Sequence, residues 1–225
     1  MTFSIAGHCT RTGMFGVAIT TSSICVGARC PHARAGVGAV ATQNVTDPTL
    51  GPKVLDAIAA GMSADKAVAA VSGAAPFAEY RQLLAVDANG VTGHFTGAKI
   101  LGTNRVSPGD HCIAAGNLLS STAVPEAMAG TFARQADQHL AERLLRALEA
   151  GVAAGGEEGP VHSAALIVVH EQPFPLVDLR CDWDDEDPIA KLRALWTAYQ
   201  GEMHAYLDRA LNPTAAPSYG VPGDE

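Results

Sequence analysis

The second residue of the chain, Thr2, is the position where residue type alone could supply a catalytic group. A small residue in this place generally permits removal of the initiator Met1, which would leave a free α-amine beside the Thr2 hydroxyl. A hydroxyl and an amine with an unperturbed pKa of about 7.7 to 8.0 form a nucleophile and a general base in one residue. The alternative is that Thr2 is merely a common second residue, because position two carries no spacing information. A strand pattern that begins at once, at Phe3, favours the catalytic interpretation.

A glycine-rich run at residues 36–41 matches the G-x-G-x-x-A pattern of dinucleotide sites, and Asp56 lies near the offset of a ribose-binding acid. In such sites the glycines open a helix whose N-terminus meets the pyrophosphate. Here the run is followed by polar, turn-forming residues and Pro48. We therefore expect no nucleotide cofactor, and the sequence indicates no other cofactor.

Three potential metal ligands, Cys25, Cys30 and His32, lie close together in the sequence. Their spacing misses the C-x-x-C pairs typical of zinc sites, so buried thiols beside a surface histidine are the better interpretation. All five cysteines are widely spaced in a chain without an export signal, and we expect them to be reduced. No metal site is predicted.

The elements that must hold Thr2 follow from the apolar patterns. The predicted strands cover residues 3–9, 15–21, 36–42, 81–87, 91–96, 111–115, 163–169 and 175–181. The predicted helices form two pairs, 54–60 with 64–71 and 125–134 with 138–150, and a long closing helix, 187–210. Because hairpins alternate with helix pairs, we predict an α+β fold with two antiparallel sheets packed face to face and covered by helices, rather than a doubly wound parallel sheet.

A chain of 225 residues fits one large domain, and we predict a single domain over residues 1–211. The Pro, Gly, Ala and Ser content of residues 212–225 predicts a flexible tail. The closing helix carries an apolar stripe from Ile189 to Ala210. This stripe predicts a homo-oligomer, unless it packs on the chain's own sheet.

The charge of the chain excludes several classes of partner. A formal net charge of -8 with only 15 Lys and Arg residues argues against nucleic-acid binding, which needs clustered positive charge. No run approaches the roughly 20 apolar residues of a membrane span, and no basic leader begins the chain. We therefore expect a cytoplasmic protein that binds neither nucleic acid nor membrane.

Four stretches resemble the bacterial family called domain of unknown function 1028, which is assigned to the N-terminal-nucleophile (Ntn) hydrolase superfamily. They are Thr2-Phe-Ser-Ile-Ala, the run from Val26 to Gln43, Gly116-Asn-Leu-Leu and Ser163-Ala-Ala-Leu-Ile-Val. The resemblance extends over residues 2 to about 198. It implies the four-layer αββα sandwich of that superfamily, with a strand order like that of proteasome β-subunits.

The resemblance also implies catalytic roles. Thr2 would be the nucleophile, Arg29 would occupy the place of the basic residue that lowers the pKa of the amine, and Asn117 and Ser163 would orient these groups. Proteasome β-subunits carry lysine where this chain has Arg29. A guanidinium stays charged and cannot relay a proton, so the role of Arg29 would be electrostatic, and the alternative is a surface charge in the loop 27–31.

Three further polar residues are predicted to bind substrate: Ser23, Gln43 and Asn44. The two amides come just after the glycine-rich strand and could contact a substrate amide or an oxyanion. They could equally form the turn that leads to Pro48.

Together these observations predict an amidohydrolase that cleaves a C–N bond of a small amide, peptide or ureido-type molecule through an acyl-enzyme on Thr2. One alternative is that Ser4 or another hydroxyl is the nucleophile, or that the fold performs a cyclohydrolase-like reaction. The other is a binding or scaffold protein that has the fold without catalysis.

Overall fold

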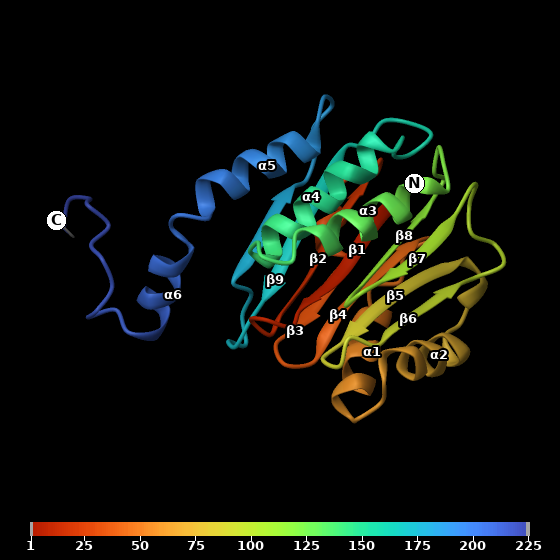
Figure 1. Cartoon of the computed structure of the whole chain (residues 1–225), viewed down its shortest axis with the longest axis horizontal. Helices are drawn as coiled ribbons and strands as arrows, with labels where there is room; N and C mark the ends of the chain where they lie inside the picture. Colours follow the sequence, from red (N-terminus) through yellow and green to blue (C-terminus); the bar gives the residue numbers. More distant parts are fainter. Residues whose placement is uncertain (1, 224–225) are drawn as a thin grey trace.

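Two antiparallel β-sheets and six α-helices make up the computed structural model, which describes residues 2–223 (Figure 1). The six-stranded sheet has the order β10-β9-β2-β1-β8-β7. Its strands are β1 (Thr2–Cys9), β2 (Met14–Thr21), β7 (Arg105–Gly109), β8 (Cys112–Asn117), β9 (Ser163–Val169) and β10 (Val177–Cys181). The four-stranded sheet has the order β3-β4-β5-β6, with β3 (Pro31–Arg34), β4 (Gly38–Asn44), β5 (Arg81–Asp87) and β6 (Thr92–Thr96).

Every strand pair within the two sheets is antiparallel, as the hairpin pattern predicts. The sequence patterns did not predict strands β3 and β7. Both lie at a sheet edge, and both are short segments with a proline and charged residues in place of an apolar run. Such compositions are tolerated at edges because one side of the strand has no ladder partner.

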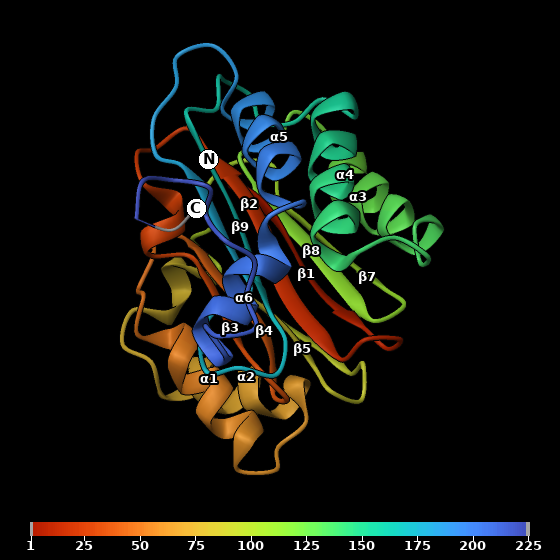
Figure 2. The ribbon, with the colours of Figure 1, turned by 90° about the vertical axis from the view of Figure 1, so that its left-hand side faces the viewer.

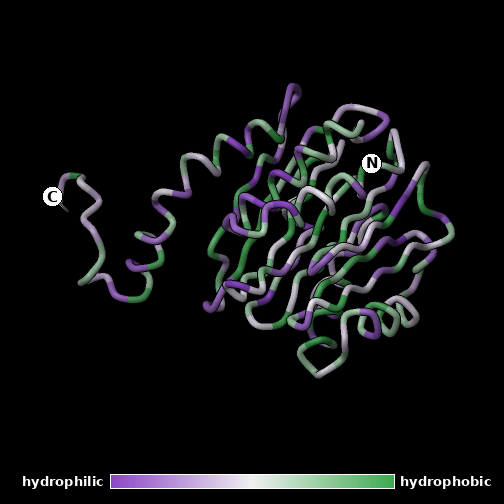
Figure 3. Tube along the Cα trace, viewed as in Figure 1, coloured by the Kyte–Doolittle hydropathy of each residue, from purple (hydrophilic) through white to green (hydrophobic). Residues whose placement is uncertain are grey.

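The helices divide between the two sheets. Helices α1 (Leu50–Ala59) and α2 (Ala64–Ala74) pack on the four-stranded sheet through a cluster that includes Val54, Val68 and Leu83. Helices α3 (Ala123–Arg134) and α4 (Leu140–Ala153) pack on the six-stranded sheet. A third apolar cluster joins the inner faces of the two sheets. The strand regions are accordingly rich in hydrophobic residues (Figure 3).

The alternation of side chains in β1 sends its residues to two different layers. Phe3 and Ile5 belong to the cluster under α3 and α4, whereas Ala6 belongs to the cluster between the sheets. Thr2 lies on the same face of β1 as Ala6. It begins a strand in the middle of the six-stranded sheet. The fold therefore holds this residue on a rigid, central element.

Glycine permits the close approach of α4 to the sheet. Gly16 lies opposite Gly7 in the β1–β2 ladder. A Cβ atom at Gly16 would lie 2.5 Å from the Ile167 carbonyl oxygen and 2.7 Å from a Leu144 methyl group. Since such separations are sterically excluded, this position requires glycine.

The predicted closing helix 187–210 is in fact two helices, α5 (Pro188–Tyr199) and α6 (Met203–Leu211). The chain turns between them, at the position of Gly201, which interrupts the helical pattern. Asp187 caps α5, where its Oδ1 accepts hydrogen bonds from the backbone N–H groups of Ile189 (3.0 Å) and Ala190 (2.8 Å).

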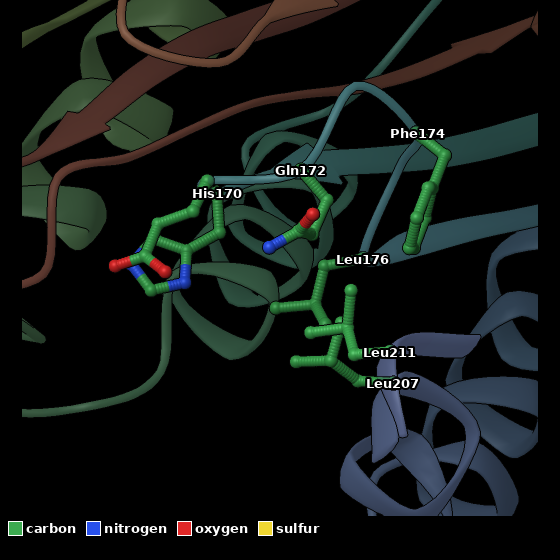
Figure 4. Close-up of a pocket in the computed structure, with 7 residues that line it drawn as sticks. His170, Gln172, Phe174, Leu176, Leu207 and Leu211 are labelled. Carbon is green, nitrogen blue, oxygen red and sulfur yellow. The ribbon is translucent and has the colours of Figure 1, made fainter. Parts of the chain in front are cut away.

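Helix α6 and residues 212–223 lie to one side of the two sheets in Figure 1, and α6 lies in front of the strands when that side faces the viewer in Figure 2. Leu207 and Leu211 of α6 approach Leu176 and Phe174 in a small cavity (Figure 4). The Arg209 guanidinium lies 3.7 Å from the centre of the Tyr219 ring, so the tail folds back on α6. The flexibility of residues 212–225 and self-association through this region stay predictions.

The N-cap of α4 carries a prediction about acid stability. His139 Nδ1 accepts a hydrogen bond from the Ala141 backbone N–H (3.2 Å), and the ring stacks on Trp196. Burial lowers the pKa of His139 to about 4, so the folded state keeps the neutral ring while the unfolded chain takes up a proton below its ordinary pKa of 6.5. The stabilisation is complete above pH 6.5 and is lost as pH falls toward 4, at a cost on the order of 1 to 3 kcal/mol.

We expect His139→Asn, which keeps an acceptor at the cap, to weaken the acid dependence of stability. Thermal unfolding at pH 7.5 and 4.5 measures it, with His94→Asn on the exposed side of β6 as the matched control. Equal losses of stability on acidification in both variants and the wild type would contradict this role of His139.

Candidate functional site

Four buried polar residues form one continuous row across the six-stranded sheet. In the antiparallel registers Thr2 lies opposite Asn117 of β8 on one side and opposite Thr21 of β2 on the other, and Thr21 lies opposite Ser163 of β9. Directly paired residues project from the same face of a sheet. Each residue of the row is at most 5% exposed. The structure thus brings together three of the predicted catalytic residues, Thr2, Asn117 and Ser163, and adds Thr21.

A chain of hydroxyl groups connects Thr2 with Arg29. Thr2 Oγ1 lies 3.0 Å from Thr21 Oγ1, which lies 3.4 Å from Ser23 Oγ. The Arg29 Nη2 group donates to Ser23 Oγ over 2.6 Å. Because a guanidinium can only donate, Ser23 accepts there, and its own O–H is available to Thr21. Either hydroxyl can be the donor in the Thr2–Thr21 pair and in the Thr21–Ser23 pair.

Arg29 itself lies in the loop that follows β2. Its Nη1 donates to the backbone oxygens of Ile24 and Cys25, the latter at 2.8 Å. The guanidinium is therefore held by the loop, and it is connected to Thr2 indirectly, through Ser23 and Thr21.

Ser163 is hydrogen-bonded to the loop that follows β2. Its hydroxyl donates to the Ser23 carbonyl oxygen (2.6 Å) and accepts from the Val26 backbone N–H (3.2 Å). Val26 opens a short 3-10 turn (Val26–Ala28), and Cys25 before it has a positive φ of 57°. Ser163 therefore positions the loop that carries Ser23 and Arg29.

A buried amide network lies between the two sheets. Ser4 Oγ donates to Gln43 Oε1 (2.6 Å), and Gln43 Nε2 donates to Gln82 Oε1 (2.8 Å). Asn117 Nδ2 donates to the same Gln82 oxygen over 3.2 Å. All four side chains are fully buried, and Asn117 Oδ1 has no hydrogen-bond partner among the described residues. Gln43, predicted to bind substrate, is thus placed inside this network.

Asn44, also predicted to bind substrate, is placed in a joint between loops. Its Nδ2 donates to the Tyr80 carbonyl oxygen (2.8 Å), and its Oδ1 accepts from the Leu101 backbone N–H (3.3 Å). Its φ of 71° lies in the left-handed region, which asparagine tolerates better than most residues. The Asn44 amide, which the sequence predicts either to bind substrate or to form a turn, is thus hydrogen-bonded to backbone groups through both its nitrogen and its oxygen.

Ser4, the alternative nucleophile, carries a prediction about stability. Removing its hydroxyl would leave the buried Gln43 oxygen without its Ser4 donor, at a cost on the order of 1 to 3 kcal/mol. We expect Ser4→Ala to lower the denaturation midpoint in urea by a corresponding amount. An unchanged midpoint would show that this hydroxyl contributes nothing to the network.

Sequence reasoning missed Glu157, which lies in the loop between α4 and β9. The residue is 7% exposed, and neither carboxyl oxygen has a hydrogen-bond partner among the described residues. Burial raises the pKa of this carboxyl to about 8. A cavity of ≈ 270 Å³ beside it is lined by Phe3, Val152 and Ile189 as well. Its sequence context, Gly-Gly-Glu-Glu-Gly-Pro, is that of an ordinary surface loop and gave no signal.

The model of a family described as a family of unknown function, DUF1028, matches residues 2–192 of the chain. The chain belongs to the DUF1028 family. A crystal structure of a DUF1028 protein from Silicibacter pomeroyi is 33% identical, with a TM-score of 0.82 over 88% of this chain and 89% of that chain. Anbu (ancestral beta-subunit) from Yersinia bercovieri is 10% identical, with a TM-score of 0.39 over 90% of this chain and 96% of that chain. No curated protein matches the chain.

The DUF1028 match includes the whole polar row and Glu157, and it ends within α5. Helix α6 and the tail therefore lie outside the part of this DUF1028 protein that the family model covers. Within residues 2–223, no three His, Cys, Asp or Glu side chains are grouped so that they could hold a metal ion. All five cysteines are free thiols, and none of the described helices has the length and apolar character needed to cross a membrane.

Proposed function

We propose that this DUF1028 protein is an Ntn hydrolase with the four-layer αββα arrangement, which cleaves the C–N bond of a small amide, peptide or ureido-type molecule through Thr2. The observation that carries this proposal is the place of the Thr2 hydroxyl. It stands at the start of a central strand and at the head of the hydroxyl chain to Arg29.

The chemistry follows from the two groups of one residue. With Met1 removed, the α-amine of Thr2 accepts the proton of its Oγ1, and the oxygen attacks the carbonyl carbon of the substrate. The C–N bond then breaks, the leaving amine takes the proton, and water hydrolyses the ester on Thr2. In this scheme the Thr21 O–H, 3.0 Å from Thr2 Oγ1, donates to that oxygen and stabilises negative charge on it, an effect that is strengthened because the row is buried.

Arg29 acts electrostatically in this scheme. Its donation to Ser23 polarises each hydroxyl in turn toward Thr2, as hydrogen bonds in a chain strengthen one another. Asn117 and Ser163 position the row from its two ends, and Ser23, which is exposed, is the member of the chain that a substrate could reach from solvent. Substrate contacts by Gln43 and Asn44 would require them to leave the partners described above.

The state of the N-terminus tests the proposal. We would prepare a chain that begins at Thr2, by cleaving a fusion at that bond, and the same chain with Met1 retained, and verify both by mass. Each is then assayed for amine release from a panel of simple amides, dipeptides and ureido compounds. Only the chain with a free Thr2 amine should hydrolyse a member of the panel, because an acylated nitrogen is not a base. Equal rates in both chains would overturn the assignment of the amine as base.

A further inference from the structure

Residues 156–158 occupy the space directly ahead of β1 in the six-stranded sheet. Glu157 forms an antiparallel bridge with Leu119, and the backbone N–H of Glu158 donates to the Leu118 carbonyl oxygen over 3.0 Å. Leu118 and Leu119 directly follow Asn117, the β8 partner of Thr2. Continuing the register of β1 beyond Thr2 therefore leads to Glu158 and Glu157.

The Glu157 carboxyl is influenced by groups on the other flank of β1 as well. Burial is the main influence on its pKa, and it is opposed by the positive amino terminus of the chain and by the Ser22 backbone N–H. Ser22 directly follows Thr21, the β2 partner of Thr2. The backbone of Glu157 is thus paired on the β8 side, and its carboxyl lies within electrostatic reach of the amino terminus and of Ser22 on the β2 side.

The surroundings of Glu157 call for a positively charged donor. Its two oxygens and Asn117 Oδ1 are buried acceptors without partners among the described residues, and the Ser22 N–H does not complete a hydrogen bond of good geometry with the carboxyl. The other charged groups that line the adjoining cavity are Glu186 and Asp187, before α5, and both are acidic. Phe3 and α4 contribute apolar or glycine surface there. An ammonium group offers three N–H donors together with a positive charge.

We propose that the Glu157 carboxylate binds the α-ammonium of Thr2 after Met1 is removed, and takes one proton from it to produce the neutral amine that activates the Thr2 hydroxyl. This inference rests on the proposed function, in which that amine is the base.

The proton transfer is balanced and needs no other reactant. One N–H bond of the ammonium breaks, an O–H bond forms on Glu157, and the nitrogen keeps the electron pair with which it next accepts the Oγ1 proton. Burial raises the pKa of Glu157 to about 8, against about 7.7 to 8.0 for an α-amine, so this carboxylate can accept a proton near neutral pH. Glu157 would thus provide what Arg29 cannot, since a guanidinium accepts no proton.

Titration of the Thr2 amine tests this inference independently of any hydrolysis. We would prepare the chain that begins at Thr2 with ¹⁵N-labelled threonine and follow the amine by NMR against pH, in the wild type, in Glu157→Gln and in Glu158→Gln. Glu158 is the exposed neighbour of Glu157 and supplies the matched control. In the wild type, removal of the last proton from the pair is opposed by the attraction between ammonium and carboxylate.

The amine pKa should therefore fall by about one unit or more in Glu157→Gln, a ten-fold loss of proton affinity, and stay unchanged in Glu158→Gln. Glu157→Asp, which keeps the charge on a shorter side chain, should give an intermediate value and serves as the second variant if the glutamine variant does not fold. An amine pKa that is the same in Glu157→Gln and the wild type would overturn the inference, and so would an equal shift in both glutamine variants. If the predicted shift of the amine pKa is observed but no hydrolysis is found, only the proposed function fails.

Discussion

Replacing Thr2 by alanine is expected to reduce the hydrolysis rate of the chain that begins at residue 2 by at least about 10³-fold. The variant retains the α-amine and the whole of the surrounding row, but it lacks the oxygen that forms the ester with the substrate. Because Thr2 is buried and its Oγ1 lies 3.0 Å from Thr21 Oγ1, the alanine variant also loses a buried hydrogen bond, and rates are compared only between folded proteins. The measurement is kcat/KM on whichever panel compound the wild type hydrolyses best.

Two variants make this experiment specific. Thr2→Ser keeps the hydroxyl and the amine, so it should retain a measurable part of the activity. Thr21→Val keeps the shape of the neighbouring side chain and removes only its O–H, which should lower kcat by roughly 10- to 10²-fold if that group stabilises charge on Thr2 Oγ1. Full activity in Thr2→Ala would transfer the chemistry to Ser4, to another hydroxyl or to a reaction without an acyl-enzyme.

The parts of the fold that the sequence predicts are those with strong local patterns. The hairpin of β1 and β2, the two helix pairs and the β9–β10 hairpin carry continuous or periodic apolar residues, and all of them are present. Edge strand β7 lacks such a pattern because much of its surface is exposed. The break between α5 and α6 was missed because apolar spacing continues across Gly201, although glycine there allows the chain to turn.

The site shows a different limit of sequence reasoning. Thr2, Asn117 and Ser163 are placed in one row by strand register, which a family resemblance could imply but which no local pattern contains. The link from Arg29 to Thr2 depends on Thr21 and Ser23 as intermediates, and this path exists only in the folded chain. The significance of Glu157 comes from burial without a partner, which is a tertiary property of a residue in a glycine-rich loop.

The buried carboxyl of Glu157 should also make the stability of the folded chain depend strongly on pH. In the folded chain with Met1 retained, burial holds the pKa of this carboxyl at about 8, against 4.5 for an unperturbed glutamate. Between these two values the unfolded chain has lost the proton and the folded chain still holds it. The unfolded state then binds fewer protons, so stability falls as pH rises from 4.5 to about 8. The shift corresponds to a loss on the order of 3 to 5 kcal/mol.

We therefore expect Glu157→Gln to be more stable than the wild type at pH 8.5 and nearly equal to it at pH 4.5. Glutamine is neutral at both pH values and close in shape to the protonated glutamate, so the variant avoids the cost of burying a charge. For a chain of this length the difference in Tm at pH 8.5 should be on the order of 10 °C. Scanning calorimetry of the Met1-retaining chains at the two pH values measures it, with Glu158→Gln as the control. A difference between Glu157→Gln and the wild type that is the same at pH 4.5 and pH 8.5 would show that the folded protein does not hold this carboxyl in its protonated form.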